Sequence, residues 1–542
     1  MATSAAIDVR DTSTPPDTTG EAAVPQKPSV FRRAVPTLTF LARRILSSLL
    51  VLLGATFIVY MLLSYSVDPL EDLRTSTAPN RDALMAARIQ MLDLNTPAPL
   101  RYLHWLRDVL TGNLGTSWRT GQSVSAMLSS AIPSTVTLVM GAIFIAIGLG
   151  ILVGIVSALR QYTRFDYGVT FMSFVLFSLP SFWVAVLLKL WGAIGFNNFL
   201  RDPQFTWPTI VIVALIFGAL WSAVIGGTRN MRWIIFGAAT AATALGMYLI
   251  SVTDWILNPG LGIVGITVLG AIVAFGLTAL TAGLDNRRAL YSALSAVVVG
   301  AILYFPLQAM LGRATWLMIF LLALVAAIVG CVIGWFFGGP DRMVSMRGAA
   351  ITAVAVGVFV FIDRVMQVWQ QYNAMSQINN RPISTMGAQT PGLQGDFWVT
   401  TLDQFTHLIL PTVTLILISF AAYTRYTRSS MLEVMNQDYI RTARAKGLPE
   451  RVVTVRHAFR NALIPLATII PLDIAAMFGG AIITERIFSW SGMGSMFIQA
   501  LNTQDAAPIM GYFLVTGTLL VIASILVDVI YAALDPRIRV DS

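Results

Sequence analysis

An all-α polytopic membrane protein is the fold class that three features of this sequence predict. Apolar residues make up 56% of its 542 residues and charged residues only 12%, whereas a soluble domain has about 25% charged residues. The mean hydropathy is +0.72. The apolar residues gather in runs near the ~20 residues that a helix needs to cross a bilayer. We therefore expect most of the chain to lie in the membrane as helices that face lipid or one another.

Charge and reactive residues argue against several function classes. The formal net charge of +9 suggests nucleic acid at first, but the basic residues flank apolar runs in short loops, as membrane topology requires. No basic stripe is interleaved with aromatic residues, so we expect no nucleic-acid partner. The single cysteine, Cys331, excludes an internal disulfide and a cysteine-based metal site. The histidines, His104, His407 and His457, are isolated, and no cluster of His, Asp and Glu has metal-ligand spacing.

The N-terminal part begins with a polar tail. Residues 1–36, rich in Thr, Pro, Ala and Asp, predict a disordered cytoplasmic tail without the apolar core of a secretory signal. Arginines then precede the apolar run Ile45–Leu63, which indicates a span with its N-terminus inside. The mixed segment 67–131 follows and is expected outside, with short helices at Arg81–Met91 and Pro99–Leu110.

Two further spans are expected before residue 200. The run Ile132–Leu159 is followed by arginines, which predict a cytoplasmic end. The next run, Val169–Leu190, contains Pro180, which can kink a membrane helix by freeing a backbone carbonyl. Together with the first span and the external segment, these runs form the predicted unit 37–200.

Residues 201–397 contain additional apolar runs, at 207–227, 233–252, 261–283, 291–310, 315–338 and 348–370. The turns between them alternate between basic and non-basic, which predicts an inserted bundle of about six spans that begins and ends outside. Asp363 and Arg364 are the exceptional charges in these runs. An ion pathway would need more intramembrane polar residues. We therefore favour an accessory bundle packed on the core, against lipid or against another subunit.

The C-terminal part, 398–542, carries the remaining predicted spans, at His407–Tyr423, Ala462–Thr484 and Gly511–Leu534. Asp473 lies within the second of these runs. A carboxylate at that depth is costly unless it faces water or a hydrogen-bond donor. It is a candidate for the lining of a translocation pathway, and a hydrogen-bonded carboxylate at a helix–helix seam is an equally good interpretation.

A basic loop, 425–461, separates the first two of these spans. Its basic residues, Arg428, Arg441, Arg444, Lys446, Arg451, Arg456 and Arg460, predict a cytoplasmic location by the positive-inside rule. Within it, Tyr439–Leu448 contains good helix formers, and Gly447 and Pro449 are typical of a helix end. A short basic helix beneath the membrane predicts a docking element, although such a loop can also serve only to orient the chain.

The string Asp438–Leu448, DYIRTARAKGL, resembles the cytoplasmic "EAA" loop of ABC importer permeases in its dipeptide and oligopeptide form. Arg441-Thr442-Ala443 stands where the general motif has Glu-Ala-Ala. Other strings are similar to the same family, namely Phe40–Arg44, Gly112–Ser117, Arg164–Gly168, Ser178–Trp183, Glu485–Gly494 and Val527–Arg539. The resemblance implies a type I importer permease core of about six spans, interrupted by the inserted bundle.

The resemblance also implies roles and partners. In the family this loop is the coupling helix that sits in a cleft of the ATPase subunit. The implied coupling residues are Tyr439, Arg441, Thr442, Ala443, Arg444, Ala445, Lys446, Gly447 and Leu448. The implied partners are a second homologous permease subunit, one or two ABC ATPase subunits and an extracytoplasmic solute-binding protein, besides membrane lipid. The chain has no phosphate loop of the G-x-x-x-x-G-K-[ST] type, so ATP and Mg²⁺ would be bound by the ATPases, and we expect no cofactor and no enzymatic activity here.

The function expected from these features is a multi-pass permease subunit of the plasma or inner membrane, with both termini cytoplasmic, that imports peptides. Nickel complexes, glutathione or another small solute are alternative substrates for the same class. An ion-coupled secondary transporter would need broken helices in a pseudo-repeat and several buried charges, and a membrane-embedded enzyme would need converging His, Asp, Glu or Ser residues. Neither pattern is present in the sequence.

Overall fold

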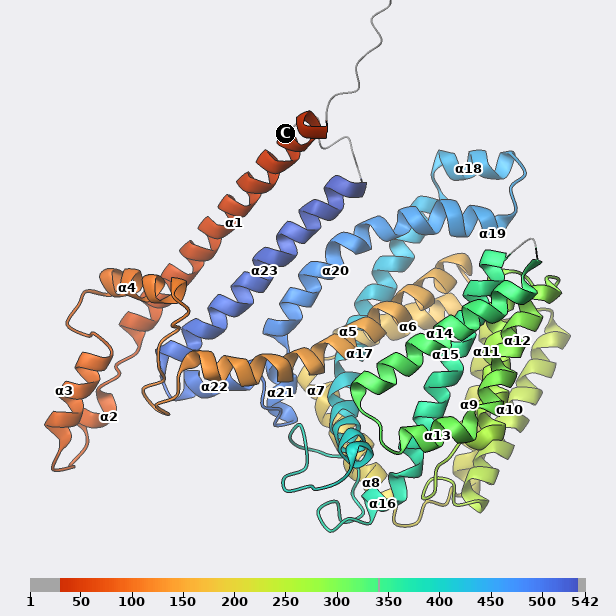
Figure 1. Cartoon of the computed structure of the whole chain (residues 1–542), viewed down its shortest axis with the longest axis horizontal. Coiled ribbons are helices and arrows are strands. Elements are labelled where there is room, and N and C mark those ends of the chain that lie inside the picture. Colours follow the sequence, from red (N-terminus) through yellow and green to blue (C-terminus); the bar gives the residue numbers. More distant parts are fainter. Residues whose placement is uncertain (1–29, 340–341, 535–542) are drawn as a thin grey trace, which may run out of the picture.

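The computed structural model describes residues 30–339 and 342–534, and in these ranges the regular elements are helices (Figure 1). Eleven helices in the described ranges are long and apolar enough to cross a membrane. A twelfth candidate is the bent pair formed by α12 (Arg287–Ile302) and α13 (Tyr304–Leu311). The all-α polytopic fold class is therefore confirmed, with a number of spans close to the one predicted.

The first part of the chain supplies a long membrane helix, a set of short helices in the segment predicted to be external, and the helices of the second and third passes. These elements are α1 (Val30–Ser66), α2 (Glu71–Arg74), α3 (Arg81–Met91), α4 (Ala98–Leu110), α5 (Val124–Leu159), α6 (Arg164–Ser178), α7 (Ser181–Leu187), a π-helical stretch (Leu188–Gly195) and α8 (Phe196–Phe199). The short helices α3 and α4 lie where the external segment predicts them. Helix α1 already begins at Val30, within the predicted tail 1–36, and residues 1–29 lie outside the described ranges.

The middle of the chain forms the helical bundle drawn in yellow-green and green in Figure 1. Besides α12 and α13 it contains α9 (Trp207–Ile225), α10 (Arg229–Val252), α11 (Gly262–Thr281), α14 (Trp316–Phe337), α15 (Arg342–Gln367) and α16 (Trp369–Asn373). Helices α14 and α15 pack closely along each other, as do α9 and α10. We call α9 to α16 the middle bundle.

The last part of the chain contains the surface helix of the basic loop and three long helices. Its elements are α17 (Phe397–Met435), α18 (Asp438–Ala445), α19 (Glu450–Val452), a π-helical stretch (Val453–Phe459), α20 (Arg460–Gly480), α21 (Ile482–Ile487), α22 (Met493–Asn502) and α23 (Ala506–Leu534). Arg537 and Arg539, at the end of the string Val527–Arg539, lie outside the described residues.

Glycines bring the two halves of the predicted core into contact. Helix α5 packs along α17, and a Cβ atom placed on Gly150 or Gly154 would lie 2.6 Å from the Cβ atom of Tyr423 or Thr427, respectively. The two glycines are four residues apart and therefore lie on the same face of α5. This small-xxx-small spacing lets helix backbones approach closely in a membrane, where packing rather than the hydrophobic effect drives helix association.

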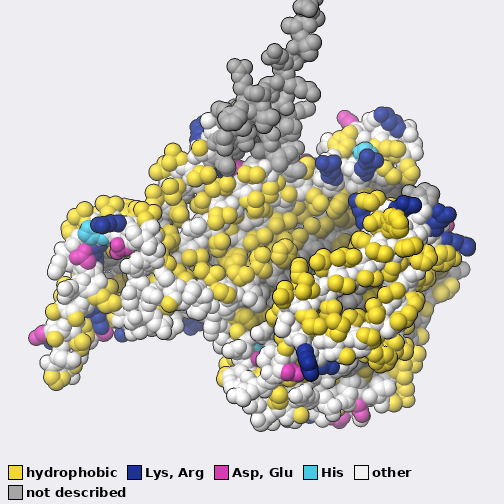
Figure 2. All heavy atoms as spheres, viewed as in Figure 1, with side chains coloured by type: hydrophobic (Ala, Val, Ile, Leu, Met, Phe, Trp, Pro, Cys, Tyr) yellow, Lys and Arg dark blue, Asp and Glu magenta, His cyan; other side chains and the backbone are white. Residues whose placement is uncertain are grey.

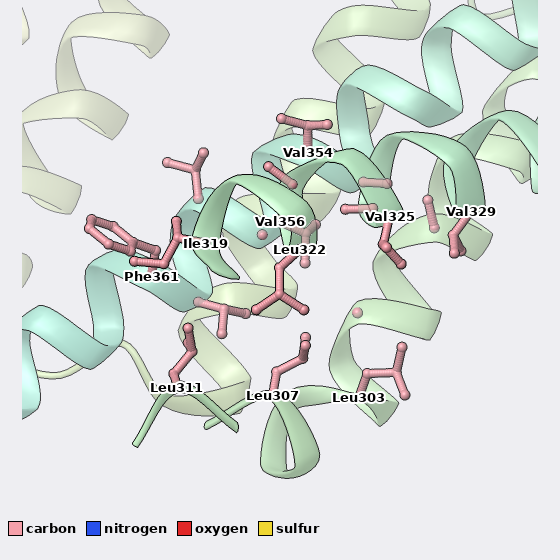
Figure 3. Close-up of a pocket in the computed structure, with 18 of the residues that line it drawn as sticks. Leu303, Leu307, Leu311, Ile319, Leu322, Val325, Val329, Val354, Val356 and Phe361 are labelled. Carbon is pink, nitrogen blue, oxygen red and sulfur yellow. The ribbon is translucent and has the colours of Figure 1, made fainter. Parts of the chain in front are cut away.

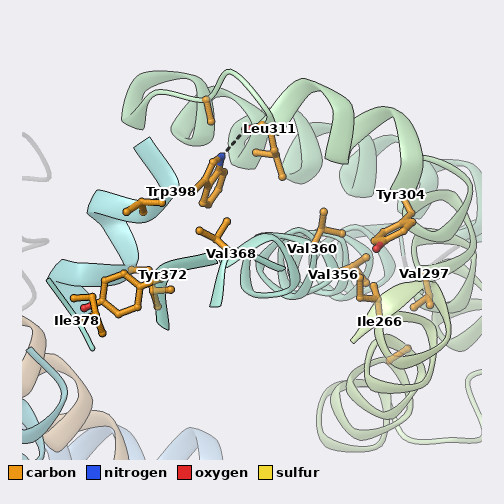
Figure 4. Packing of buried hydrophobic residues seen from close by; sticks show 14 of the residues in the cluster. Ile266, Val297, Tyr304, Leu311, Val356, Val360, Val368, Tyr372, Ile378 and Trp398 are labelled. Atoms are coloured by element: carbon orange, nitrogen blue, oxygen red, sulfur yellow. Dashed lines mark hydrogen bonds between the residues drawn. The ribbon is translucent and has the colours of Figure 1, made fainter. Parts of the chain in front are cut away.

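The middle bundle is joined to α17 by a shared apolar core. Trp398, in the first turn of α17, is 1% exposed and donates its indole N–H to the carbonyl of Leu311 at 2.6 Å (Figure 4). Val360 and Val368 from the α15 region belong to the same cluster. The bundle therefore packs on the rest of the chain through buried side chains.

Two predicted spans are interrupted in the structure. The predicted span Val169–Leu190 is wrong as a single helix, because α6 ends at Ser178 and α7 begins at Ser181. Leu179 and Pro180 between them have extended backbones, since the ring of Pro180 disfavours a helical conformation in the residue before it. The predicted run 291–310 bends by 55° at Leu303, where Pro306 in the first turn of α13 can make no N–H bond to the preceding helix.

The ends of the helices sort into two sides. In Figure 1, α18 lies at the top together with the start of α1 and the end of α23, whereas α13, α16 and the short helices α2 and α3 lie toward the bottom. The turns between α9 and α10 and between α11 and α12 also lie toward the top. Figure 2 shows Lys and Arg side chains around α18 and at the neighbouring ends of the bundle, above a broad apolar surface. The assignment of the upper side to the cytoplasm stays a prediction from the positive-inside rule.

Candidate functional site

Helix α18 is a surface helix with one buried face. Ile440 is 0% exposed and Ala443 6%, and their spacing of three residues places them on the same side of a helix. They pack into a cluster with Met431 of α17, Val453 and Ala458. The remaining predicted coupling residues are exposed, with Tyr439 at 43% and Leu448 at 39% among them. Of the predicted coupling residues, Ala443 therefore anchors the helix, and the others are presented to the outside.

A Schellman motif ends α18. Gly447 has φ +74°, its N–H donates to the carbonyl of Arg444 at 2.9 Å, and the N–H of Leu448 donates to the carbonyl of Ala443 at 3.4 Å. This pair of hydrogen bonds satisfies carbonyls that the last helical turn leaves free, and it requires a left-handed residue at the position of Gly447. The helix ends at Ala445, slightly before the predicted end at Leu448, with Gly447 in the role that the sequence indicates.

The cations of α18 differ in how strongly they are held. Arg444 forms a two-pronged ion pair with Glu450, with Nη2–Oε1 at 2.7 Å and Nε–Oε2 at 3.2 Å. The hydrogen bond from Arg444 holds the pKa of the Glu450 carboxyl below its usual range. Arg441 lies 3.6 Å from Asp438, and both side chains are largely exposed. The side chain of Lys446 forms no hydrogen bond or ion pair with any described residue. The outer surface of α18 therefore presents two cations that the chain itself hardly neutralises.

The base of α18 is connected to α20. Asn461, in the first turn of α20, donates its amide N–H to the Tyr439 hydroxyl at 3.1 Å and to the carbonyl of His457 at 3.0 Å. Helix α18 also packs on the π-helical stretch Val453–Phe459, which leads directly into α20. π-Helical turns within helices occur frequently at functional sites. A displacement of α18 would therefore reach α20 through direct contacts.

A buried ion pair braces the end of α17 below α18. Asp166 of α6 is 2% exposed and accepts hydrogen bonds from Arg428 Nε at 2.7 Å and Nη2 at 2.9 Å. The Ser157 hydroxyl of α5 donates at 2.6 Å and the Tyr162 N–H at 3.0 Å. The Arg428 guanidinium holds the pKa of Asp166 down to about 2. The ion pair thus ties α17 to the α5–α6 turn. Sequence reasoning missed this pair, although Arg428 belongs to the basic loop 425–461 and Asp166 to the string Arg164–Gly168.

The structure places Asp473 far from α18. Asp473 lies thirteen positions after Arg460 along α20, which corresponds to about 20 Å at 1.5 Å per residue. Its carboxylate is half-buried and lies beside the hydroxyl of Tyr423 on α17, with a geometry that falls short of a normal hydrogen bond. Among the described residues no other donor is assigned to it. The seam and the pathway interpretations both remain open, and the scarcity of donors favours a partner from outside the chain.

Glu485 is a buried carboxylate whose donors come from two other elements. This residue, the first of the string Glu485–Gly494, is 0% exposed and accepts from the Thr135 hydroxyl at 2.6 Å and the Ser495 N–H at 2.9 Å. The N–H of Met493 donates in turn to Thr135 Oγ1 at 2.8 Å. Glu485 therefore holds the turn before α22 against α5. The sequence string contained this residue, but its structural role depends on a threonine that is distant in the chain.

Asp363, the exceptional acid of the middle bundle, is a structural anchor. It accepts hydrogen bonds from the Leu261 and Gly262 N–H groups at 2.7 and 2.9 Å, which caps the start of α11. The Tyr304 hydroxyl donates at 2.7 Å, and the side-chain amides of Gln308 and Gln367 donate at 3.1 and 2.9 Å. These donors compensate a buried charge, so Asp363 needs no ion or substrate.

One histidine has a partner that sequence spacing did not suggest. His407 is 4% exposed, and its Nδ1 lies 2.8 Å from the Asp403 carbonyl. The Asp403 carboxylate accepts from the Tyr372 hydroxyl at 2.9 Å and from the Thr390 N–H at 2.8 Å. The expectation of an isolated histidine was therefore wrong, and the network is structural. In the described ranges no group of three or more His, Cys, Asp and Glu side chains lies close enough together to hold a metal ion.

The long apolar helices, together with a basic surface helix that rests on two of them, define a multi-pass helical membrane protein. The chain belongs to the family described as binding-protein-dependent transport system inner membrane component, which matches residues 287–540. It is similar to dipeptide- and oligopeptide-type permeases of this family, as the sequence strings predicted.

Three relatives illustrate the similarity. The oligopeptide transport system permease protein OppB of Mycobacterium tuberculosis (strain ATCC 25618 / H37Rv) is 36% identical over 240 residues, which cover 43% of this chain and 74% of the relative. The oligopeptide transport system permease protein AppB of Bacillus subtilis (strain 168) is 24% identical over 502 residues, covering 92% of this chain and 99% of the relative. The dipeptide transport system permease protein DppB of Escherichia coli (strain K12) is 45% identical over 148 residues, covering 27% and 42%, respectively.

The coverages show that this chain is longer than OppB, because the same alignment takes up a larger share of the relative than of this chain. The family match begins at Arg287, within the predicted insertion 201–397. The boundaries of the insertion therefore stay a prediction.

Proposed function

We propose that this chain is a transmembrane permease subunit of an ATP-driven importer, and that α18 couples it to ATPase subunits. The observation that carries the proposal is the two-sided character of α18. Ile440 and Ala443 fasten the helix to α17 and the π-helical stretch, while Tyr439, Arg441 and Lys446 remain exposed. An exposed surface that combines an aromatic ring with hardly neutralised cations is suited to a partner with an apolar and acidic cleft.

The contacts of α18 support a mechanism for the coupling. ATP-driven closure of the ATPases would displace α18, and the Tyr439–Asn461 contact would pass the displacement to α20. The Asp166–Arg428 ion pair would keep the end of α17 and the α5–α6 turn moving together. Rigid-body motion of packed helices in this manner is a common form of conformational switching. The two arrangements would open the passage alternately to each side of the membrane.

The proposed substrates are peptides, because the related permeases are named for oligopeptides and dipeptides. We propose that Asp473 lines the passage, where its carboxylate, with Tyr423 beside it, is free to meet a polar substrate or water. Nickel complexes, glutathione or another small solute remain alternative substrates of the same class. An ion-coupled secondary transporter is the alternative mechanism.

The proposed assembly follows from this function. It contains a second homologous permease subunit, one or two ATPase subunits that bind ATP and Mg²⁺, and an extracytoplasmic solute-binding protein. The proposed location is the plasma or inner membrane, with both termini and α18 in the cytoplasm. This chain would itself carry no cofactor and catalyse no reaction.

Site-specific cross-linking tests the coupling role. In a background in which Cys331 is replaced by alanine, Arg441→Cys is expected to cross-link to an ATPase subunit in the assembled complex. Arg232→Cys, exposed near the start of α10 in the middle bundle, is the matched control and is expected to give no such product. If Arg441→Cys never captures an ATPase in a complex that hydrolyses ATP, the coupling proposal is wrong.

Transport by the assembled complex in proteoliposomes tests the substrate class. We expect ATP-dependent uptake of a labelled dipeptide or oligopeptide in the presence of the binding protein, and lower uptake with Asp473→Asn. Uptake of glutathione or of a nickel complex, with no peptide uptake, would assign the alternative substrate. Uptake that follows an ion gradient and does not require ATP would reject the importer class.

A further inference from the structure

The middle bundle contains an elongated apolar groove of about 450 Å³. Helices α14 and α15 form one wall, and the bent pair α12–α13 forms the other (Figure 3). The groove exists because α12 and α13 diverge by 55° at Leu303, which moves α13 away from α14. Leu303, Leu307 and Leu311 point into it from one side, and Ile319 and Leu322 from the other.

The dimensions of the groove suit a single hydrocarbon chain. Its lining runs along α14 from Ile319 to Ile333, about 21 Å at 1.5 Å per residue. This exceeds the ~15 Å depth of one leaflet of a bilayer whose hydrocarbon core is about 30 Å thick. The lining of the groove is almost entirely aliphatic and aromatic, so the space is suited to a hydrocarbon chain.

Two arginines lie at the α13 end of the groove. Arg313 belongs to the short turn that joins Leu311 to Trp316, and both of these residues line the groove. It is exposed and forms no ion pair or hydrogen bond through its side chain with any described residue. Arg364 of α15 lies beside the same turn, with one guanidinium nitrogen 3.9 Å from the place of a Cβ atom on Gly312.

The neighbouring groups leave this positive charge largely uncompensated. Arg364 donates to Gln367 Oε1 at 3.2 Å and stacks 5.9 Å from the Trp398 ring, but its Nε has no partner among the described residues. The adjacent Asp363 already accepts from its own five donors. Asp396, at the start of α17, accepts from the N–H groups of Trp398 and Val399. An apolar groove that ends at two such cations is complementary to an acyl chain with an anionic headgroup.

We propose that this groove is a binding site for one phospholipid, with an acyl chain between α14 and the α12–α13 pair and the headgroup phosphate at Arg313 and Arg364. The lipid belongs to the leaflet on the α13 side. It fills the space left by the bend at Leu303 and so connects α13, α14 and α15. This proposal rests on the middle bundle alone and does not require the transport function.

Photolabelling with a defined lipid tests the proposal. The probe is phosphatidylglycerol with a diazirine in its acyl chain, incorporated into bilayer discs that contain the full chain. Peptides of α14 and α15 are expected to carry the label. Gly357→Phe is the informative variant, because Gly357 lines the groove and a Cβ atom there would meet nothing within 4 Å. We expect it to fold and to lower labelling in the groove at least fivefold.

Matched controls separate a specific site from general lipid contact. Gly348→Phe introduces the same side chain on α15, at a position that does not line the groove and where a Cβ atom also meets nothing within 4 Å, and it is expected to leave labelling unchanged. Arg313→Ala is expected to weaken labelling roughly fivefold, the effect of one basic residue near a lipid headgroup. Arg232→Ala, on an exposed basic residue of α10, is expected to have no effect.

The outcomes are decisive for the groove. Loss of labelling with both Gly357→Phe and Arg313→Ala supports the phospholipid site. Unchanged labelling in either variant, with an unfolding temperature like that of the unaltered chain, overturns it. A photo-crosslinker introduced at Leu322 that captures a polypeptide instead of a lipid in the assembled complex also overturns it and assigns the groove to a partner subunit.

Discussion

At the scale of single residues, the buried carboxylates of this protein divide by the number of donors that surround them. Asp166 and Asp363 each accept several hydrogen bonds, and Glu485 accepts bonds from two separate elements. A buried charge needs such donors, because its desolvation is otherwise costly. Asp473 has only the Tyr423 hydroxyl beside it. The donor-rich acids therefore serve the structure, whereas Asp473 has capacity left for a substrate or water.

The Asp166–Arg428 pair gives the first stability prediction. Asp166→Asn should lower the free energy of unfolding by about 2 kcal/mol, because one partner of a buried pair is removed while Arg428 remains partly accessible to water. Thermal unfolding of the purified protein in bilayer discs measures the change. Asp438→Asn is the control, since the Arg441–Asp438 pair is largely exposed and such pairs contribute little. Equal effects of the two variants would contradict the bracing role.

The same pair predicts a pH dependence. The pKa of Asp166 is held down to about 2 in the folded protein, below the ~3.9 of an unfolded chain. Its contribution is therefore fully present above about pH 5 and is lost as the pH falls toward 2. The difference in unfolding temperature between the unaltered chain and Asp166→Asn should shrink as the pH is lowered through 4. A difference that stays constant from pH 7 to pH 3 would show that Asp166 is not stabilised as a carboxylate.

At the scale of elements, α18 is stabilised by its contacts with the rest of the chain and by the motif at its C-terminal end. The helix has only eight residues, so it is too short to be stable by itself. Its buried face, formed by Ile440 and Ala443, and its Schellman motif at Gly447 hold it in place. The exposed face of α18 is thus held in a defined conformation by the chain itself.

Substitutions at Gly447 test this view of the helix end. Gly447→Ala should lower the stability of α18 by about 1 kcal/mol, because an L-residue is strained in the left-handed conformation, although there is space for its Cβ atom. Gly447→Asn should be milder, since asparagine adopts this conformation more readily. Hydrogen exchange of the α18 amides measures the order of the variants.

Transport measured on the same variants distinguishes a local from a coupling effect. We expect uptake to fall in the order glycine, asparagine, alanine, with membrane insertion unchanged. A bulky residue such as tryptophan should uncouple ATP hydrolysis from uptake. Full uptake with Gly447→Trp would remove α18 from the coupling mechanism.

Prolines show how elements depend on their neighbours. Pro180 separates α6 from α7, and Pro306 lies in the first turn of α13 just after the 55° bend at Leu303. Pro411 and Pro471, in contrast, lie buried within continuous helices. Neighbouring helices can compensate the hydrogen bond that a proline removes. Local sequence therefore could not indicate which of these prolines would end a helix.

At the scale of the whole molecule, the helices of the middle bundle alternate in direction. Its turns alternate between the two sides of the molecule (Figure 1), so the helices before and after it keep their relative directions. The bundle is nevertheless packed on α17 through Trp398 and Leu311. It contributes to the stability of the chain as well as to its length.

Deletion of residues 201–397 tests whether this segment contains an even number of membrane passes. Both termini should remain on the same side of the membrane, because an even number of passes is removed, and reporter fusions at each end measure this. The shortened chain should be less stable, since the Asn197 amide loses its two hydrogen bonds to the Ile383 backbone. A control deletion of 201–368 retains Ile383 and should be less damaging. A C-terminal reporter on the opposite side would show that the number of passes is odd.

The sequence by itself determined the fold class, nearly all of the membrane passes and the position of the short basic helix. Hydrophobic runs, basic turns and the glycine at the end of α18 are local properties of the sequence. They determine membrane insertion, orientation and helix ends through interactions between residues that are close in the chain. Only the tertiary structure decided that Ala443 is an anchor, that Asp166 meets Arg428, and that Asp363 and Glu485 are structural while Asp473 has only the Tyr423 hydroxyl beside it. It also decided where the groove between α14 and the bent pair α12–α13 opens. These features depend on side chains that are distant in sequence, and their contacts exist only once the helices have packed.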